Sequence, residues 1–304
     1  MHRAAEIIIV GAGFAGLSAA IYLGRAQRDV LVIDAGKSMA RWEPKVQNYL
    51  GFPAGISGKR LLERARAQAH QYRVRFKHDY ITAAAIRNHQ FTLRGNSASY
   101  SCHVLLLATG IFHVPPDIPG IKACLGHSIF FCKDCDAVRV RGKRVAVYGW
   151  TNETAEYALA MMAYTSQLII VTDGRRPSWS RQHALWLKRR EIFVATQPIS
   201  TLRRSGSKLK ALLLEDGKEV LINAIFTTRG DIVFSGLATE LGARLDAEGQ
   251  IVTDQCLRTS VPGLYASGCV TTANCQMIIA AGQGAAAAQA INRDLLMDTL
   301  KLKT

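Results

Sequence analysis

A strand–turn–helix–strand segment near the start of the chain limits the possible folds more than any other sequence feature. Residues 6–10 form an apolar run typical of a buried strand, and the pattern G-x-G-x-x-G follows at once from Gly11 to Gly16. An alanine-rich helical stretch comes next, and a second apolar run at residues 30–33 ends at Asp34. This order and spacing predict the βαβ unit of a Rossmann fold. The chain should therefore contain a parallel sheet covered by helices.

Each glycine of the G-x-G-x-x-G turn has a physical role in binding a dinucleotide. Gly11 permits the tight turn, Gly13 lets the backbone approach a pyrophosphate, and Gly16 lets the helix pack close to the strand. The helix N-terminus offers free N–H groups to the anion. Asp34 is placed to accept hydrogen bonds from the adenosine ribose. A glycine-rich turn without a ligand is the alternative, but the strand, the helix and the terminal acid together favour a dinucleotide.

A second strand–turn–helix begins at residue 144, and most of its glycines are missing. Thr151 and Thr154 stand where small glycines are expected, and a β-branched residue at the second position blocks close approach to a pyrophosphate. We interpret this segment as a Rossmann half whose usual ligand was lost or changed. The candidate second nucleotide site consists of Gly149, Trp150, Thr151, Asn152, Glu153, Arg175 and Arg176.

Turns and prolines divide the 304 residues, which are room for about two domains. The apolar segment 104–108 ends in Thr109 and Gly110, and prolines at positions 115, 116 and 119 then predict a hinge. A glycine-punctuated segment at 263–268 precedes a helix expected over about 276–292. We predict an α/β fold with two Rossmann-like nucleotide-binding domains, the second inserted into the first. The expected parts are residues 1–115, 116–244 and 245–304.

The chain contains a single C-x-x-C, formed by Cys132 and Cys135. Two thiols at this spacing can close a small disulfide loop, and the charge of Lys133 favours a thiolate. Zinc would need further ligands at suitable spacing, and no second C-x-x-C or H-x-x-x-H is present, so we expect no metal site. Redox activity is favoured over metal binding and inert burial. Asp136 is a candidate proton donor or acceptor, or else a helix cap.

Composition excludes several classes of protein. Hydrophobic residues make up 49% of the chain, which is enough for a sizeable core and excludes a disordered protein. The apolar runs are strand-sized, so we expect no transmembrane helix. The first strand follows the start so closely that no room is left for a secretory signal. We therefore expect a cytoplasmic protein.

Basic residues exceed acidic ones, 38 to 23, which gives a formal net charge of +15. The excess lies in two clusters, at 59–77 and 175–190, and no nucleic-acid-binding signature accompanies it. We expect no nucleic-acid partner. Within the second cluster, Trp179, His183 and Trp186 recur at helical spacing, so this stretch could rest on an anionic membrane. Packing on the inserted domain with the charges outward is the interpretation we favour.

Five segments together resemble the low-molecular-weight thioredoxin reductase family, over nearly the full length of the chain. They are GAGFAG at 11–16, NYLGFPAGISG at 48–58, LLLATG at 105–110, CKDCD at 132–136 and GLYASGCVTTANCQMIIAAGQGAA at 263–286. The resemblance implies an FAD domain with an inserted second nucleotide domain that carries the C-x-x-C. It also implies a homodimer and a dithiol or disulfide partner, either a protein or a small molecule.

The resemblance assigns roles to individual positions. The FAD pyrophosphate would be held by the first motif, including Phe14 and Ala15, and the flavin would be lined by Asn48, Thr109 and Gln276. The remaining cofactor positions lie in the third and fifth motifs, at Gly110, Gly268 and Cys269. Cys132 and Cys135 would be the exchanging disulfide, with Cys135 nearer the flavin and Asp136 as the acid beside it.

The departures from the family are informative. Cys269 replaces the aspartate that bonds the FAD ribityl chain, which removes a charge-assisted hydrogen bond worth about 1.5–3 kcal/mol. Cys269 and Cys275 could form a second thiol pair, although we favour buried thiols. In the family the turn at 149–154 holds NADPH, and a basic stretch after the next strand reads its 2′-phosphate. Arg175 and Arg176 could still hold a phosphate there.

These features favour an FAD-dependent dithiol/disulfide oxidoreductase that does not use NADPH. In the sharpest form of this hypothesis a second FAD occupies the former NADPH site, with Trp150 stacked on one of its rings. The alternatives are an NADPH- or ferredoxin-dependent thioredoxin reductase and a small-molecule dithiol oxidase. A flavin-binding protein without enzymatic activity is a further alternative.

Overall fold

A computed structural model describes residues 2–301, and the chain divides into two compact units. The first unit contains the residues up to Phe112 and those from Ile232 onward, and the second is the insertion His113–Asp231. The chain enters the insertion through β7 (Ile111–His113) and leaves it through β16 (Asp231–Val233), and these two strands pair with each other. The α/β fold with an inserted second domain, as expected from the sequence, is therefore present.

The observed boundaries differ from the expected residue numbers. The insertion begins at 113 rather than 116, and the chain returns to the first unit at 232 rather than 245. The second difference arises because α6 (Gly236–Glu240) buries Ala238 in the core of the first unit, together with Leu241 and Ala243. The proline and glycine signals mark turns, whereas the boundary follows this packing.

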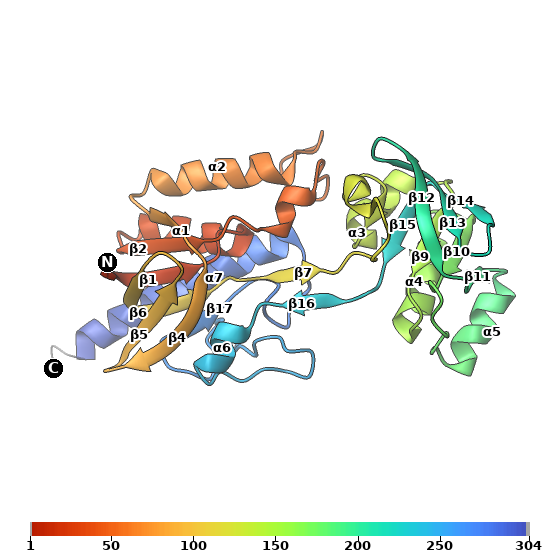
Figure 1. Ribbon diagram of the computed structural model, residues 1–304. Helices are drawn as coiled ribbons and strands as arrows, with labels where there is room; N and C mark the ends of the chain where they lie inside the picture. Colours follow the sequence, from red (N-terminus) through yellow and green to blue (C-terminus); the bar gives the residue numbers. More distant parts are fainter. Residues whose placement is uncertain (1, 302–304) are drawn as a thin grey trace. The chain divides into compact units, whose positions relative to one another are not determined.

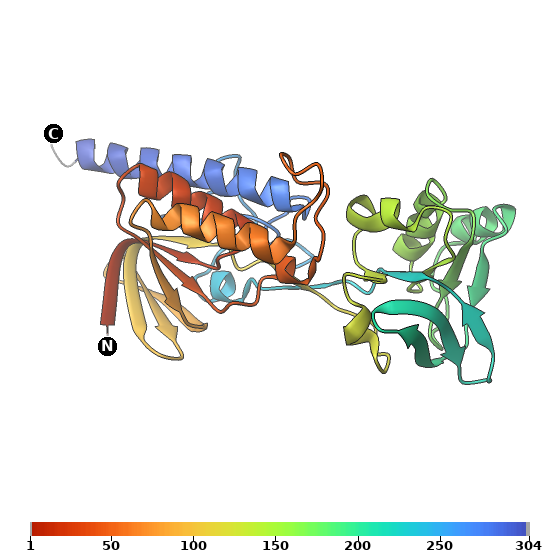
Figure 2. The same ribbon diagram turned by 90° about the horizontal axis from the view of Figure 1, so that it is seen from above.

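The first unit is built on a seven-stranded sheet (Figures 1 and 2). Its order is β3-β2-β1-β6-β5-β4, and β17 also pairs with β6. The strands β1, β2, β3, β6 and β17 run parallel, whereas β4 and β5 form an antiparallel extension. The strand bounds are β1 His2–Val10, β2 Val30–Asp34, β3 Arg75–His78, β4 Ile81–Arg87, β5 Gln90–Gly95, β6 Ser99–Leu107 and β17 Leu264–Ala266.

Both faces of this sheet are buried, which is why its central strands are apolar without interruption. Ile7 and Ile9 of β1 point into one core, whereas Ile8 and Val10 point into the other. The first core is covered by three helices, and the figures show them together on one face of the sheet. These helices are α1 Phe14–Arg25, α2 Gly58–His70 and α7 Met277–Lys301. Residues Met39–Trp42 form a short 3-10 helix, η1.

The second unit contains a five-stranded parallel sheet in the order β11-β10-β9-β15-β8 and an antiparallel sheet β12-β13-β14. The strands are β8 Ile129–Phe130, β9 Val145–Tyr148, β10 Leu168–Val171, β11 Phe193–Ala195, β12 Ile199–Ser205, β13 Lys208–Leu214, β14 Glu219–Leu221 and β15 Ala224–Thr227. The helices are η2 Ile121–Cys124, α3 Lys133–Asp136, η3 Ala137–Val140, α4 Asn152–Met161 and α5 Arg181–Arg189. Both units therefore place a glycine turn at the carboxyl end of a central parallel strand, β1 in one and β9 in the other.

Within residues 2–301, no helix has both the length and the apolar character needed to cross a bilayer. Among the same residues, no group of three or more His, Cys, Asp or Glu side chains is arranged to hold a metal ion.

Candidate active site

The first glycine turn joins β1 to α1, and its packing requires two of its glycines. Gly11 has φ +106°, and a Cβ there would lie 2.3 Å from the carbonyl oxygen of Ala108 on the neighbouring strand. A Cβ on Gly16 would lie 1.9 Å from the carbonyl oxygen of Gly11. No side chain fits at either position, so these glycines set the close approach of the helix to the sheet.

Gly13 differs from its neighbours because space is open beside it. It precedes α1 as the N-cap, makes no side-chain cap, and the nearest atom to an added Cβ is Ser38 Oγ at 3.9 Å. The start of this helix is therefore available to an anion. Phe14 and Ala15 point into the protein, with the Phe14 ring 5.6 Å from that of Tyr49.

Asp34 ends β2 beside the glycine turn, as its spacing predicts. Its Oδ1 accepts a hydrogen bond from the backbone N–H of Ala12 at 3.2 Å, and its Oδ2 pairs with Arg66 at 3.1 Å. A carboxylate accepts about four hydrogen bonds, so Asp34 still has capacity for ribose hydroxyls. Arg66 was missed at the sequence level, because the basic cluster of residues 59–77 reads as a solvated surface.

The structure brings two of the expected flavin-lining residues together. Asn48 Nδ2 donates a hydrogen bond to Gln276 Oε1 at 3.1 Å, although 228 positions separate them. Thr109 is tied elsewhere, because its hydroxyl donates to the carbonyl of Phe234 at 2.6 Å. The carbonyl of Gly110, which has φ +69°, accepts a hydrogen bond from the backbone N–H of Phe234. Thr109 and Gly110 thus anchor the returning chain.

The closing motif departs from the expectation for its cysteines. Cys269 and Cys275 form a disulfide with their Cα atoms 4.8 Å apart, so the preference for two buried thiols was wrong. Cys275 is exposed, and the turn of six residues brings it back to Cys269, which cannot be read from the spacing alone. Gly268 has φ +83°, and its N–H donates to Gln283 Oε1 at 2.8 Å.

The remaining cysteines are three free thiols, namely Cys102, Cys124 and the half-buried Cys256, and the C-x-x-C pair. Cys102 and Cys124 are buried and free, which agrees with the interpretation of small core residues, and burial raises the pKa of the Cys102 thiol to about 12. Cys132 and Cys135 form a disulfide at the start of α3, with Cα atoms 5.3 Å apart. The backbone N–H of Cys135 donates to Cys132 Sγ at 3.1 Å, a contact that also favours a thiolate on Cys132.

Asp136 follows the second cysteine and is buried, with 2% of its surface exposed. Burial raises the pKa of its carboxyl, and the ion pair with Arg139 at 2.6 Å opposes that effect. Arg139 also donates to the carbonyl of Gly126. Burial, followed by the carboxylates of Asp134 and Asp136, raises the pKa of Tyr157 as well. A buried acid with a raised pKa therefore directly follows the disulfide in the chain.

The second glycine turn, between β9 and α4, is closed by its own side chains. Thr154 Oγ1 accepts a hydrogen bond from the backbone N–H of Thr151 at 3.2 Å and lies 2.8 Å from Thr228 Oγ1. Thr151 and Thr154 form a capping box at the start of α4. A Cβ on Gly149 would lie 2.4 Å from the hydroxyls of both Thr154 and Thr228.

A neighbouring segment, residues 175–180, lies against the same turn. Ser178 donates from its backbone N–H and its hydroxyl to the carbonyl of Trp150, at 2.7 and 3.0 Å. The N–H of Ser180 donates to Asn152 Oδ1 at 2.7 Å. The guanidinium of Arg175 lies 4.5 Å from the centre of the Trp150 ring. The structure thus brings most of the expected second site together, with its groups bonded to one another.

Two residues of the expected second site contribute less to this closure. Glu153 is exposed at the start of α4, and partial burial, with the charges of Asp231 and Glu156, raises its pKa. Arg176 is exposed. After β10, Asp173 accepts from the hydroxyl of Tyr148 at 2.7 Å and from the N–H of Ile199 at 2.7 Å. Both of its carboxylate oxygens therefore serve the fold of this unit.

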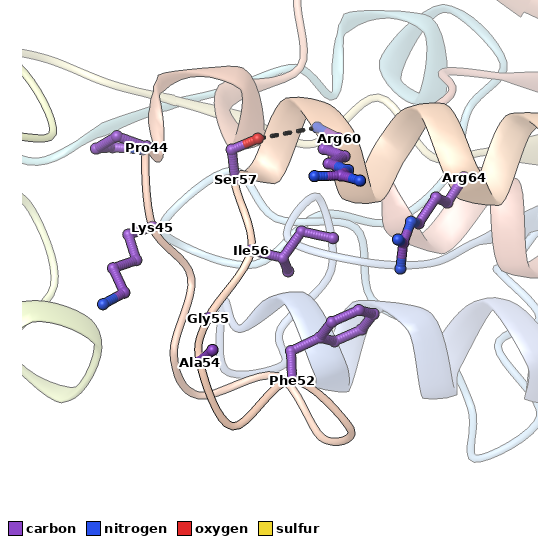
Figure 3. Close-up of a pocket in the computed structure, with 9 residues that line it drawn as sticks. All are labelled: Pro44, Lys45, Phe52, Ala54, Gly55, Ile56, Ser57, Arg60 and Arg64. Atoms are coloured by element: carbon purple, nitrogen blue, oxygen red, sulfur yellow. Dashed lines mark hydrogen bonds between the residues drawn. The ribbon is translucent and has the colours of Figure 1, made fainter.

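A basic pocket of about 350 Å³ lies beside the loop that leads into α2 (Figure 3). Arg60 and Arg64 extend from successive turns of the helix on one side of the loop, and Lys45 lies on the other. The hydroxyl of Ser57 accepts from the N–H of Arg60 at 3.2 Å and caps the helix. The pocket belongs to the segment at 48–58 and its flanks.

Comparison with known proteins decides the family. The family model described as pyridine nucleotide-disulphide oxidoreductase matches residues 5–288. The chain belongs to this family. Within it, the chain is similar to thioredoxin reductases and is an FAD-dependent disulfide oxidoreductase.

The similarity extends over the whole chain. The thioredoxin reductase of Treponema pallidum is 32% identical over 296 residues, 94% of this chain and 95% of that protein. The thioredoxin reductase of Coxiella burnetii is 30% identical and covers 97% of each chain. Among solved structures, HlmI aligns with a TM-score of 0.93 at 26% identity, over 99% of this chain and 95% of the other.

The first unit fits the FAD that this family of oxidoreductases binds. The space beside Gly13 would be filled by any Cβ, and the start of α1 has no side-chain cap. The glycine turn would hold the pyrophosphate and Asp34 the ribose. Cys269 would offer no charge to the ribityl chain, because its sulfur is bonded to that of Cys275.

The family's second nucleotide turn has a different structure in this chain. The backbone N–H groups of Thr151 and Thr154 at the start of α4 are bonded to threonine hydroxyls in a capping box, whereas α1 has no side-chain cap. Helix α5, within the basic stretch 175–190, packs on α4 through the buried Leu187, and His183 Nε2 lies 2.9 Å from Glu156 Oε1. Trp186 is exposed on this helix.

Proposed function

We propose that this oxidoreductase transfers an electron pair between FAD in its first unit and the Cys132–Cys135 pair without using NADPH. The closed turn of the second unit is the observation that carries the proposal. A dinucleotide pyrophosphate at α4 would have to displace the hydrogen bond between Thr151 and Thr154 and the contacts of Ser178 with Trp150. Each such contact contributes about 1 kcal/mol, so their loss weakens binding by tenfold or more.

The residues of the chain supply the thiol chemistry. In one direction a thiolate of the partner attacks the Cys132–Cys135 disulfide, a mixed disulfide forms, and the partner's second thiol then closes the partner's own disulfide. Two thiols remain on the enzyme, and the released sulfur takes a proton. Asp136 holds that proton, because burial keeps its carboxyl protonated to a higher pH than an ordinary aspartate. FAD, when bound, supplies two-electron acceptance or donation.

The partner we propose is a dithiol or disulfide, carried by a protein or a small molecule. Relatives named thioredoxin reductase support a disulfide protein such as thioredoxin. A homodimer is part of this proposal, and sedimentation of the FAD-loaded protein tests it. Peripheral contact with an anionic membrane, through Trp186 and the basic residues of α5, is the least supported part of the proposal. Failure of the protein to bind anionic vesicles at low salt would contradict this contact.

A second FAD in the former NADPH site is the sharpest form of the hypothesis. It draws support from the aromatic Trp150 and from the guanidinium of Arg175 stacked on it, two groups that hold rings and phosphates in flavin sites. For this ligand to bind, the contacts of residues 175–180 with the turn must open. The number of flavins per chain therefore tests this part separately.

The experiment uses the purified, FAD-loaded protein without oxygen. The flavin absorption is followed while NADPH or a dithiol such as dithiothreitol is added. Dithiol should bleach the flavin and NADPH should leave it oxidised, whereas rapid bleaching by NADPH would overturn the proposal.

Flavin released on denaturation should then be counted, and about two per chain would establish the second flavin site. With oxygen present, rapid peroxide formation from the small dithiol would identify a small-molecule dithiol oxidase, and bleaching only by reduced ferredoxin would identify a ferredoxin-linked reductase.

A further inference from the structure

The loop between β17 and α7 carries a second disulfide, Cys269–Cys275, outside the C-x-x-C. It lies at the carboxyl end of the sheet, in the same unit as the open glycine turn, since an added Cβ on Gly268 would lie 3.0 Å from Ala15 Cβ. Gln276, which bonds Asn48, follows Cys275 directly. A redox-active bond at this place would stand beside the flavin-lining pair.

The first half of the loop does not depend on this disulfide. The hydroxyl and the N–H of Thr271 donate to the carbonyl of Gly268 at 2.8 and 2.9 Å. The N–H of Gly268 is bonded to Gln283, and the carbonyl of Val270 accepts from Ile251 at 2.8 Å. A disulfide that closes so short a loop also removes little entropy from the unfolded chain. Structural stapling therefore accounts poorly for its presence.

The two sulfurs differ in access and in electrostatic surroundings. Cys275 is exposed, whereas Cys269 is half-buried. The carbonyl of Gln276 accepts the N–H of Ala280, so Cys275 lies directly before the first turn of α7, a helix of 25 residues. The positive end of the helix dipole stabilises a thiolate at this position. Cys275 is thus open to attack and is a good leaving group.

We propose that Cys269–Cys275 is a second thiol–disulfide exchange site, which takes electrons from an external dithiol through Cys275. A thiolate of the dithiol attacks Cys275 Sγ, the bond to Cys269 breaks, and Cys269 leaves as a thiolate and takes a proton. The second thiol of the dithiol then attacks its own sulfur in the mixed disulfide and releases Cys275. The dithiol becomes a disulfide and the enzyme gains two thiols. The site does not depend on the proposed function of Cys132–Cys135.

The first test uses the FAD-loaded variant Cys132→Ser/Cys135→Ser, which lacks the C-x-x-C pair. The folded protein is treated with dithiothreitol or with a reduced thioredoxin, alkylated, digested and weighed by mass spectrometry. The peptide with residues 269–275 should gain two alkyl groups within minutes, while Cys256, a half-buried free thiol, reports alkylation without reductant. Reduction by both reagents identifies a site open to protein dithiols, and reduction by dithiothreitol alone identifies a small-dithiol site. Resistance of the folded protein to both would overturn the proposal, as would two alkylated thiols before any reductant is added.

The second test compares two single-cysteine variants in the same background. Cys269→Ser leaves the exposed Cys275, and Cys275→Ser leaves the half-buried Cys269. Cys275 should react with an aromatic disulfide reagent about tenfold faster than Cys269 or more, and its rate should be less dependent on pH because its thiolate is stabilised. Equal rates, or a faster Cys269, would contradict the assigned order of attack. If a variant does not fold, as judged by circular dichroism, the first test still decides the proposal.

Discussion

Thr154 Oγ1 lies 3.2 Å from the backbone nitrogen of Thr151 and accepts its hydrogen bond, which closes the turn between β9 and α4. The same hydroxyl lies 2.8 Å from that of Thr228. The corresponding turn before α1 has Gly13 as its N-cap and no side-chain cap. The two Rossmann halves of this chain thus differ in how the start of the helix after the turn is capped.

Thr154→Ala should lower the free energy of unfolding of the second unit by about 1–2 kcal/mol. The substitution leaves the N–H of Thr151 without its cap and removes a partner from the half-buried Thr228 hydroxyl. Urea unfolding followed by far-UV circular dichroism measures the change. Thr196→Ala, at an exposed position of the same unit, is the control and should leave stability unchanged. Equal free energies of unfolding for the two variants would show that the Thr154 hydroxyl does not stabilise the second unit.

Gly284 and Gly282 of α7 should respond in opposite ways to alanine. A Cβ on Gly284 would lie 2.0 Å from the carbonyl oxygen of Ala15 in α1, whereas a Cβ on Gly282 would meet nothing within 4 Å. Gly284→Ala should lower the free energy of unfolding by about 1–3 kcal/mol, because the added methyl group pushes the two helices apart. Gly282→Ala should raise the free energy of unfolding by up to about 1 kcal/mol, because alanine has the higher helix propensity. Thermal unfolding of the two variants side by side checks the sign.

Asp79 should make stability depend on pH between about 4 and 2. Burial alone would raise the pKa of this carboxyl, but hydrogen bonds from Tyr100, Ser97 and backbone N–H groups outweigh it and lower the pKa from 3.8 to about 2. A lowered pKa stabilises the fold above pH 4, and the effect is lost as the pH falls toward 2.

Asp79→Asn should therefore reduce the free energy of unfolding by about 2 kcal/mol at neutral pH, and the difference from the wild type should shrink in acid. Denaturant unfolding at several pH values measures it. Glu248→Gln, at an exposed site of the same unit, should give parallel curves. A constant difference for Asp79→Asn down to pH 2 would show that the loss comes from packing rather than charge.

Asp136→Asn should slow disulfide exchange at Cys132–Cys135 by about 100-fold. Because the pKa of Asp136 is raised, the wild-type rate of disulfide reduction, expressed per thiolate of the attacking dithiol, should fall as the pH rises through that pKa, and the asparagine variant should lose this dependence. Stopped-flow rates over a pH series measure both effects. Asp134→Asn is the matched control, since Asp134 lies on the same short helix but is exposed and paired with Lys133. A similar loss in both variants would point to the charge of the helix instead of to a proton donor.

Gly13→Ala should leave the protein folded and reduce its FAD content. The space beside Gly13 is open in the protein itself, so the added Cβ would conflict with the cofactor alone. We expect FAD affinity to fall about tenfold or more, measured by FAD release on dilution. Unchanged FAD affinity would show that the pyrophosphate does not approach this residue.

Much of the architecture and the central chemistry could be predicted from local patterns. The turn from Gly11 to Gly16 and Asp34 at the end of the next strand lie within one βαβ unit, so their pattern can be recognised in a short stretch of sequence. The Cys132–Cys135 disulfide is equally local, since three positions separate its sulfurs. The loss of glycines after Gly149 likewise predicted an altered second turn.

Other features depend on residues that only the fold brings together. Asn48 bonds Gln276 across 228 positions, and Arg66 of helix α2 reaches Asp34 at the end of strand β2. The closure of the second turn by Ser178 and the disulfide between Cys269 and Cys275 also required the structure. The sequence by itself determined the repeated strand–turn–helix units and the redox pair, because short-range periodicity and chain stiffness encode them. Tertiary structure decided which side chains fill a turn or pair across it, because those contacts depend on how distant segments pack.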